Sequence, residues 1–441
     1  MVMQVIKVQY NSRDVGALSY DDKKKVGFFE YAASFINTGI ELSPIKMPLK
    51  RNIYSFPNLE EYAFKGLPGL VADSLPDDFG NAVLNAWVAM QGSGRNPDSI
   101  TPIERLQYTG TRGMGALTYH PATKVKKLSA SQTIEIDSLV KIAQQIVDGR
   151  SNFEVELKPN DEDDKEGMLA LLSVGMSAGG ARPKAVLAFN KDFTKVRSGQ
   201  ATIPDGFRHY LMKFDGVSEH NKNKETFGDP MGYGAMEYTY HQMAVKAGVD
   251  MTECHLLKEG MRRHFITKRF DRDWNKRIHV QTLNAMDHVS FRKPGTYSYA
   301  ELFGLARRLG LSRDEAKQLF KRMVFNVVAR NHDDHSKNFA FMMDDNGNWS
   351  LAPAYDIAYS YKPKSEWVNS HWMTINGKRD GFVRDDFYQF EKVSPVFNKE
   401  FIDNTINHTI EVVSQWANMA QTNNVPLTLI ELIESNLRIE L

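Results

Sequence analysis

The sequence NHDDHSKN at positions 331–338, followed downstream by Tyr355-Asp356, says more about the fold than any other stretch of the chain. It comes after a segment with apolar residues at helical spacing, 312–331, and before a strand-turn-strand pattern whose turn is the Asp-Asn-Gly at 345–347. A polar loop at the end of a buried helix is therefore followed, after a hairpin, by a second polar loop. Both loops contain side chains of the kinds used in catalysis and in metal binding.

The spacing Asp-x-x-x-x-Asn followed by a later Asp is the pattern used in phosphoryl transfer from a nucleotide. In this pattern Asp333 orients the attacking hydroxyl, while Asn338 and Asp356 hold Mg²⁺ against the phosphates. One amide and one carboxylate suit a hard cation that keeps much of its water. The spacing therefore predicts phosphotransfer with ATP and Mg²⁺ as cofactors.

Two other interpretations of this loop stay open from the residues alone. A cluster of His, Asp and Asn between a helix and a strand can serve turn formation and capping. Alternatively, the His-Asp-Asp-His run at 332–335 could ligate a catalytic metal in a phosphohydrolase, because imidazole and carboxylate suit Zn, Mn or Fe. Adjacent residues in a turn rarely all point at one ion, which weighs against the phosphohydrolase.

A loop of small residues, GMSAGGARPK at 175–184, precedes a strand-like AVLAF segment. Backbone N–H groups free of bulky side chains can approach phosphate oxygens closely, and Arg182 or Lys184 could add positive charge. The loop departs from the Walker A pattern, and a glycine-rich turn by itself is also typical of a flexible loop.

The order of the parts favours the phosphate-binding interpretation. Lys213 follows in a strand-like segment and Glu237 on a predicted helix, which is the order found in a protein kinase. Arg269-Phe270-Asp271 ends another strand, where the connection between two lobes would meet adenine. Lys213 could instead be an edge-strand lysine that reaches water, and the 269–271 segment a surface hairpin with an ion pair.

Composition excludes several classes of protein. The chain has 441 residues, 42% hydrophobic and 25% charged, which is typical of a multidomain globular protein. Lys and Arg total 55 and Asp and Glu total 54, so no global charge draws the chain to nucleic acid. Cys254 is the single cysteine, and no export signal or membrane span is recognisable. We expect a cytoplasmic protein with no membrane partner.

The motifs together resemble the HipA family of serine/threonine kinase toxins. The similarity runs over nearly the whole chain and is most specific in DDHSKNF and PAYDIAYS. The matching segments are SLPDDFGNAVL (74–84), MGALTYHP (114–121), SAGGARPK (177–184), LMKF (211–214), KRFDRDW (268–274), DDHSKNF (333–339) and PAYDIAYS (353–360).

The resemblance implies an α+β fold. A small β-rich N-terminal domain, residues 1–125, would precede a protein-kinase-like two-lobed core, residues 126–441. The N-lobe would span about 126–275, and an enlarged all-helical C-terminal lobe about 276–441. Short alternating strands in the first forty residues, read as an antiparallel meander, agree with this division.

The resemblance also implies roles for individual residues. Asp333 would be the catalytic base, with His335 and Asn338 near the nucleotide and Mg²⁺, and Asp356, preceded by Tyr355, a metal ligand. Lys213 would bind phosphate. Ser177 stands where family members autophosphorylate and switch themselves off. The nucleotide would be covered by Gly179, Gly180, Ala181, Arg182, Pro183 and Lys184, and adenine contacted mainly through backbone groups of Lys268, Arg269 and Phe270.

Family toxins phosphorylate glutamyl-tRNA synthetase and pair with a DNA-binding, HipB-like helix-turn-helix antitoxin. The resemblance thus implies a protein substrate, and DNA contact mainly through the antitoxin. A catalytically inactive module that only binds such an antitoxin is the alternative. The chain departs from the family pattern at Asp334, where a small residue is familiar, and at Lys268, where an acidic one is. Asp334 would add negative charge beside the base.

Overall fold

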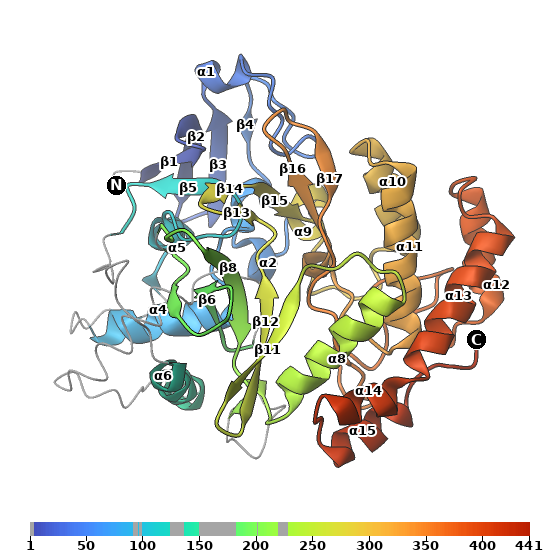
Figure 1. Cartoon of the computed structure of the whole chain (residues 1–441). Coiled ribbons are helices and arrows are strands. Elements are labelled where there is room, and N and C mark those ends of the chain that lie inside the picture. Colours follow the sequence, from blue (N-terminus) through green and yellow to red (C-terminus); the bar gives the residue numbers. More distant parts are fainter. Residues whose placement is uncertain are drawn as a thin grey trace.

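A computed structural model describes residues 4–90, 96, 99–123, 136–149, 182–200, 202–218 and 228–441. The described residues form two five-stranded sheets, a three-stranded sheet and two small two-stranded ones, and the helices α10 to α15 lie together on one side of the molecule (Figure 1). The fold is α+β, with an N-terminal β-rich region and a kinase-like two-lobed core, as the sequence predicts.

The N-terminal region is built on an antiparallel five-stranded sheet with the order β4-β3-β2-β1-β5. Alternating apolar residues place one face of each strand in a core that contains Ile6, Leu18 and Phe29. The predicted meander is confirmed by β1 to β3, and β5 adds itself beside β1. The strands are β1 (Val5–Tyr10), β2 (Arg13–Asp21), β3 (Val26–Tyr31), β4 (Ile53–Tyr54) and β5 (Leu117–His120).

The helices described before residue 150 are α1 (Ala33–Ile36), α2 (Glu61–Phe64), α3 (Gly69–Ala72), α4 (Asp78–Met90), α5 (Pro102–Thr109) and α6 (Ile136–Gly149). Helix α5 begins with the Thr101–Glu104 capping box and with Pro102 in its first turn. Helices α4 and α6 pack on the next sheet, because Phe79 and Leu139 share a core with Leu187 and Met212 of that sheet.

The N-lobe sheet is antiparallel with the order β11-β12-β8-β6-β7, so β8 is flanked on both sides. Helix α8 packs between this sheet and the helical lobe, where Met236 and Tyr240 enter the large helical core. The elements of the N-lobe are β6 (Lys184–Asn190), β7 (Val196–Ser198), β8 (Phe207–Lys213), β9 (Val217–Ser218), β10 (Gly228–Asp229), α8 (Tyr233–Lys246), β11 (Cys254–Glu259) and β12 (Arg262–Lys268).

The C-terminal lobe is not all-helical as predicted, because it contains a three-stranded sheet, β15-β16-β17, in which β16 and β17 are the predicted hairpin. Helix α11 ends at Val328, three residues before the predicted end, because Arg330 adopts a φ of 57° that no α-helix contains. In the part of the chain that the structure describes, no helix combines the length and apolar character needed to cross a bilayer.

The remaining elements are the small pair β13 (Arg272–Asp273) and β14 (Lys276–Arg277), then β15 (His279–Thr282), α9 (Leu283–Asp287), α10 (Tyr299–Arg308), α11 (Arg313–Val328), the 3-10 turn η2 (Ser336–Asn338), β16 (Ala340–Met343), β17 (Trp349–Leu351), α12 (Arg384–Tyr388), η3 (Gln389–Lys392), α13 (Lys399–Val413), α14 (Trp416–Thr422) and α15 (Leu427–Glu434).

Candidate active site

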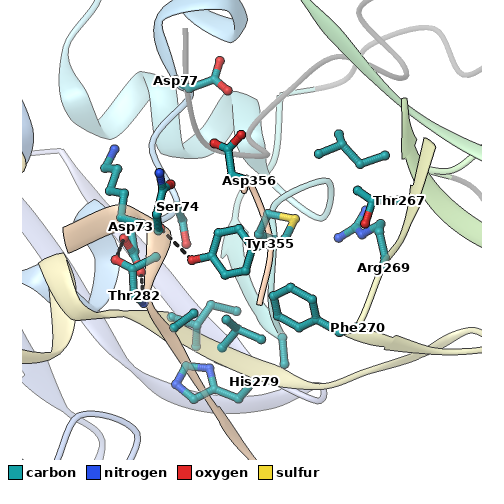
Figure 2. A pocket seen from close by; sticks show the side chains of 18 of the residues that line it. Asp73, Ser74, Asp77, Thr267, Arg269, Phe270, His279, Thr282, Tyr355 and Asp356 are labelled. Atoms are coloured by element: carbon teal, nitrogen blue, oxygen red, sulfur yellow. Dashed lines mark hydrogen bonds between the residues drawn. The ribbon is translucent and has the colours of Figure 1, made fainter. Parts of the chain in front are cut away.

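A pocket opens where the N-terminal region, the N-lobe sheet and the C-terminal lobe meet (Figure 2). Three of the residues predicted from the 331–356 segment, Asn338, Tyr355 and Asp356, line it, together with Lys213. The other lining residues are Leu70, Asp73, Ser74, Leu75, Asp77, Met114, Ala116, Leu117, Leu211, Phe265, Thr267, Lys268, Arg269, Phe270, His279, Val280, Thr282, Lys337 and Ala340.

Lys213 joins the two lobes at this pocket. Its Nζ donates to Asp356 Oδ1 at 2.5 Å and also to Glu237 Oε1. The Lys213 side chain is only 8% exposed, so these ion pairs are screened little by water. Residues 143 positions apart are thereby held together, and the strand lysine that the sequence singled out is a buried bridge rather than an edge-strand lysine reaching water.

Electrostatics keep the Lys213–Asp356 pair charged. Burial lowers the pKa of Lys213, but the carboxylates of Asp356 and Glu237 outweigh burial, so the net pKa is raised. Burial also acts to raise the pKa of Asp356, but Lys213 and Arg182 outweigh it, and the net pKa lies below its usual range. Asp356 therefore remains an anionic oxygen ligand near neutral pH.

The start of helix α8 determines where Glu237 lies. Asp215 Oδ1 accepts hydrogen bonds from the N–H groups of Gly232 and Gly234, at 2.8 and 3.3 Å. A Cβ at position 234 would lie 1.9 Å from the carbonyl oxygen of Arg263 on β12, so only glycine allows this approach. The helix is thus held close enough to the sheet for Glu237 to reach Lys213.

The predicted catalytic loop is held by its own polar groups. Asn338 Nδ2 donates to the carbonyl oxygen of Asp333 at 2.7 Å, so the Asn338 amide oxygen is the atom that can ligate a cation. His335 Nδ1 accepts the N–H of Lys337, and its Nε2 lies 3.6 Å from Asp333 Oδ1. The Asp333 side chain remains 44% exposed, which leaves its carboxylate accessible to a substrate hydroxyl.

Asp334 points away from this surface. Its carboxylate accepts hydrogen bonds from Trp372 N–H at 2.6 Å, Tyr299 O–H at 2.8 Å and His371 Nδ1–H at 3.1 Å, inside the helical lobe. The expected extra charge beside the base is therefore a buried anchor for the loop.

The metal phosphohydrolase interpretation is not supported by this geometry. His332 is fully buried, with its ring 4.2 Å from that of His371, whereas Asp333 lies at the surface. The His-Asp-Asp-His run therefore does not converge on one point. Among the described residues, no three His, Cys, Asp or Glu side chains are arranged to hold a metal ion.

Tyr355 and Asp356 are fixed by a hydrogen bond and an unusual backbone conformation. Tyr355 O–H donates to the carbonyl oxygen of Lys337 at 2.6 Å, which ties this loop to the catalytic loop (Figure 2). Asp356 has a φ of 55°, sparsely populated for a residue with a side chain and common at functional sites. Its Oδ1 is occupied by Lys213, so Oδ2 is the oxygen available to a cation.

The connection between the lobes lies at the other end of the pocket. The Lys268 N–H already donates to Glu253 O, and its carbonyl accepts from Thr252 Oγ1, so its backbone is occupied. The Arg269 guanidinium forms a buried bidentate pair with Asp271, at 2.8 and 2.6 Å. Phe270 turns its ring toward Tyr355, with 5.5 Å between ring centroids. The Arg269 N–H likewise donates to the carbonyl oxygen of His209 at 2.9 Å, so it is not available to a base.

The structure describes only the end of the small-residue loop. Arg182 Nη1 lies 3.8 Å from Glu237 Oε2, and the Pro183 carbonyl accepts the N–H of Phe214. Lys184 Nζ pairs with Asp77 Oδ2 at 3.0 Å instead of lining the pocket. Ser177, Gly179, Gly180 and Ala181 lie outside the described residues.

Sequence reasoning missed Lys337, Asp73 and Asp77, which also line the pocket. Burial lowers the pKa of Lys337, although Asp73, Asp77 and Asp78 act in the opposite direction. Lys337 lies inside the DDHSKN motif, so its position beside Asn338 was a usable signal. Asp73 and Asp77 precede a helix in a different domain and carry no local pattern that points to a nucleotide.

The pocket residues fit a nucleotide with its metal. An apolar end near Phe270 can accept a base, and Lys213 supplies positive charge at the other end. Asn338 and Asp356 offer one amide and one carboxylate oxygen there, a donor set that suits Mg²⁺. The arrangement can therefore bind a nucleoside triphosphate, whereas the predicted Asp333 and His335 do not line the pocket themselves.

Comparisons with known proteins agree with the motifs. Residues 6–120 match the family model of the HipA N-terminal domain, and residues 176–417 match that of the HipA-like C-terminal domain. "Putative kinase Y4mE" from Sinorhizobium fredii is 27% identical over 193 residues, 41% of this chain and 42% of that protein. A "Putative kinase" from Haemophilus influenzae is 24% identical over 184 residues, 35% of this chain and 53% of that protein. The chain thus spans about half the length of these curated relatives.

A solved structure shares the fold over almost the whole chain. It is the Shewanella oneidensis toxin-antitoxin system of HipA, HipB and operator DNA, whose matching chain has a TM-score of 0.62 and 15% identity. The match covers 98% of this chain and 95% of that chain. Because one family model alone covers more than half of the sequence and the second covers most of the N-terminal region, the chain belongs to the HipA family.

Proposed function

We propose that this protein is an ATP- and Mg²⁺-dependent serine/threonine protein kinase of the HipA type. The observation that carries the proposal is the buried Lys213, which pairs with Glu237 on α8 and with Asp356 across the lobes. A lysine held in this way is positioned to contact phosphate while Asp356 stays ionised. The family membership and the kinase names of two relatives support the same activity.

Each residue has a role that follows from its contacts. Asp333, exposed at the surface, would accept or orient the proton of the substrate hydroxyl. Asn338 and Asp356 would hold Mg²⁺, which neutralises charge on the phosphates when bound. Lys213 would stabilise charge on the transferring phosphoryl group. Phe270 would contact adenine through its backbone, with Lys268 and Arg269 also lining the pocket.

We propose that the biological role is that of the toxin in a type II toxin-antitoxin pair. The Shewanella oneidensis structure contains HipB and operator DNA, which supports a HipB-like helix-turn-helix antitoxin as partner here. The formal net charge of +1 suits DNA contact mainly through that antitoxin. We further propose a cytoplasmic location and a protein substrate from translation, such as glutamyl-tRNA synthetase.

The proposal extends to regulation and domain division. Autophosphorylation of Ser177 would inactivate the kinase, with the 177–184 loop covering the nucleotide in the active state. Residues 1–125 would form the N-terminal domain and 126–441 the kinase-like core, divided near 275. The three largest sheets occupy successive parts of the chain, which supports these boundaries. Helix α4 crosses the first boundary in space, because it belongs to residues 1–125 but packs on the N-lobe sheet.

The test is phosphotransfer by purified protein. With labelled ATP and Mg²⁺, the wild type should incorporate label at Ser177, and Ser177→Ala should remove that label. Asp333→Asn should abolish transfer but retain a Mg²⁺-dependent thermal shift with ATP, because Asp333 acts on the hydroxyl rather than on the nucleotide. Equal labelling of wild type and Asp333→Asn would overturn the proposal.

The alternative of an inactive binding module gives a different result. Such a protein would be stabilised by a HipB-like antitoxin yet show neither phosphotransfer nor a nucleotide-dependent shift. The intact Asp333, Asn338 and Asp356 argue against it, since an inactive module has no chemical need for all three.

A further inference from the structure

One side of the pocket is not part of the kinase-like core. The N-terminal domain contributes five apolar residues to the lining of the pocket: Leu70, Leu75, Met114, Ala116 and Leu117. The N-lobe contributes Leu211, Phe265 and Thr267. Apolar side chains from two domains therefore enclose one slot, which is the usual environment for a planar base.

Hydrogen bonds join the segment around Met114 to the connection between the lobes. Gly115 N–H donates to Asp271 Oδ2 at 2.8 Å, and Arg272 Nη1 donates to Gly115 O at 3.1 Å. Arg277 donates to the carbonyl oxygens of Thr111 and Gly113, at 2.6 and 3.0 Å. Since Arg269 pairs with the same Asp271, Met114 lies at the base end of the pocket.

A buried ion pair fastens the N-terminal domain at the opposite end. Asp77 Oδ2 pairs with Lys184 Nζ at 3.0 Å, and Asp77 Oδ1 accepts Gly80 N–H at 2.7 Å at the start of α4. Both side chains of the pair are 6% exposed or less. Lys184 is the cross-strand partner of Lys213, so this fastening lies beside the phosphate end.

Asp73 fastens the same segment to the C-terminal lobe. Its carboxylate accepts both the N–H and the Oγ1–H of Thr282, each at 2.7 Å (Figure 2). The N-terminal domain is thus held at the connection between the lobes, at the N-lobe and at the C-terminal lobe by polar contacts, most of them buried or part-buried. Because it is fixed at three places, this surface of the N-terminal domain is expected to form a static side of the pocket rather than a mobile lid.

We propose that segments 70–77 and 114–117 of the HipA N-terminal domain are part of the nucleotide site itself, with Met114 packing on the purine base of a nucleoside triphosphate. The inference rests on the proposed kinase function and deepens it. Nucleotide binding would then depend on the N-terminal domain as well as on the two lobes, and the side chain at position 114 would help determine affinity for the base.

The test replaces Met114, which is partly exposed, with tryptophan. Met114→Trp fills the base end and should raise the KM for ATP at least about 10-fold while kcat changes by less than about 3-fold, since uniform ground-state and transition-state binding is lost. The matched control is Met261→Trp on the β11–β12 turn, where the methionine is 77% exposed. The control should keep the wild-type KM.

A second variant, Met114→Ala, covers the case in which the tryptophan cannot be accommodated. If Met114→Trp does not fold, Met114→Ala takes its place and should raise the KM for ATP at least about 3-fold by removing contact with the base. A folded variant of either kind with the wild-type KM would overturn the inference and leave the proposed function standing. If the wild type itself neither binds ATP nor transfers phosphate, the proposed function fails instead.

Discussion

Lys184 and Lys213 are directly opposite each other on the neighbouring antiparallel strands β6 and β8, yet their ammonium groups bind carboxylates from different parts of the chain. Lys184 pairs with Asp77 of the N-terminal domain, and Lys213 pairs with Asp356 of the C-terminal lobe. Two adjacent like charges are thus neutralised by two domains, and the N-lobe sheet is joined to both.

The Asp77–Lys184 pair should matter more for stability than an exposed pair of the same chemistry. Asp77→Asn keeps a good N-cap for α4 but leaves the buried Lys184 ammonium unpaired, so we expect a loss of about 3–5 kcal/mol in urea unfolding. The double variant Asp77→Asn/Lys184→Met should recover much of this. The control Asp14→Asn breaks the exposed Lys7–Asp14 pair and should cost at most about 1 kcal/mol. Equal losses in the two single variants would contradict the prediction.

Structural and chemical roles of Lys213 can be separated. Lys213→Met leaves Glu237 and Asp356 without their shared cation, and should lower the free energy of unfolding by about 3–5 kcal/mol and abolish phosphotransfer. Adding Glu237→Gln removes the buried one of the two carboxylate charges, so stability should return in part. Activity should not return, because the lysine ammonium that would contact the phosphates is still missing. Recovery of activity in the double variant would mean that Lys213 acts only through folding.

The neighbouring aspartates of the catalytic loop should give opposite phenotypes. Asp334→Ala leaves three donors inside the lobe, from Trp372, Tyr299 and His371, without their acceptor, and should cost about 3 kcal/mol or more. Asp333→Ala, at an exposed position, should change stability by less than about 1 kcal/mol and abolish phosphotransfer. Thermal unfolding and labelled-ATP assays on both variants provide the comparison. A large stability loss in Asp333→Ala would contradict the assignment.

Buried histidines should make the fold sensitive to mild acid. Burial lowers the pKa of His279 to about 4, with its Nε2–H donating to Leu42 O at 3.1 Å. The unfolded chain therefore binds a proton near pH 6.5 that the folded protein does not bind until about pH 4, so stability falls as pH drops through this range. Between pH 7 and 5 this one group should cost about 1–2 kcal/mol.

The measurement is urea unfolding of wild type and His279→Gln at pH 7 and at pH 5. The variant should lose about 1–2 kcal/mol less between the two pH values than the wild type, whatever its stability at pH 7. His408→Gln, at an exposed position, is the control and should follow the wild type. Identical pH dependence of His279→Gln and wild type would show that His279 does not contribute.

The sequence by itself determined the elements and the family. Apolar periodicity located the N-terminal meander, helices α8 and α11 and the β16–β17 hairpin, because local pattern and capping residues act over a few positions. The motifs around Asp333, Asn338 and Asp356 predict phosphoryl transfer, since their spacing within one loop and across one hairpin is itself the signal. The helical end at Val328 was misplaced because a left-handed residue such as Arg330 has no clear sequence signature.

Only the tertiary structure decided which charges meet. The sequence does not show that Lys184 turns to Asp77, 107 positions away, or that Asp334 points into the helical lobe while Asp333 stays outside. Nor does it show that Met114 and Leu75 face the pocket that contains Lys213. These relationships arise from packing between domains. A buried charge needs an oppositely charged partner, and the fold can bring that partner from any part of the chain, so sequence separation does not identify it.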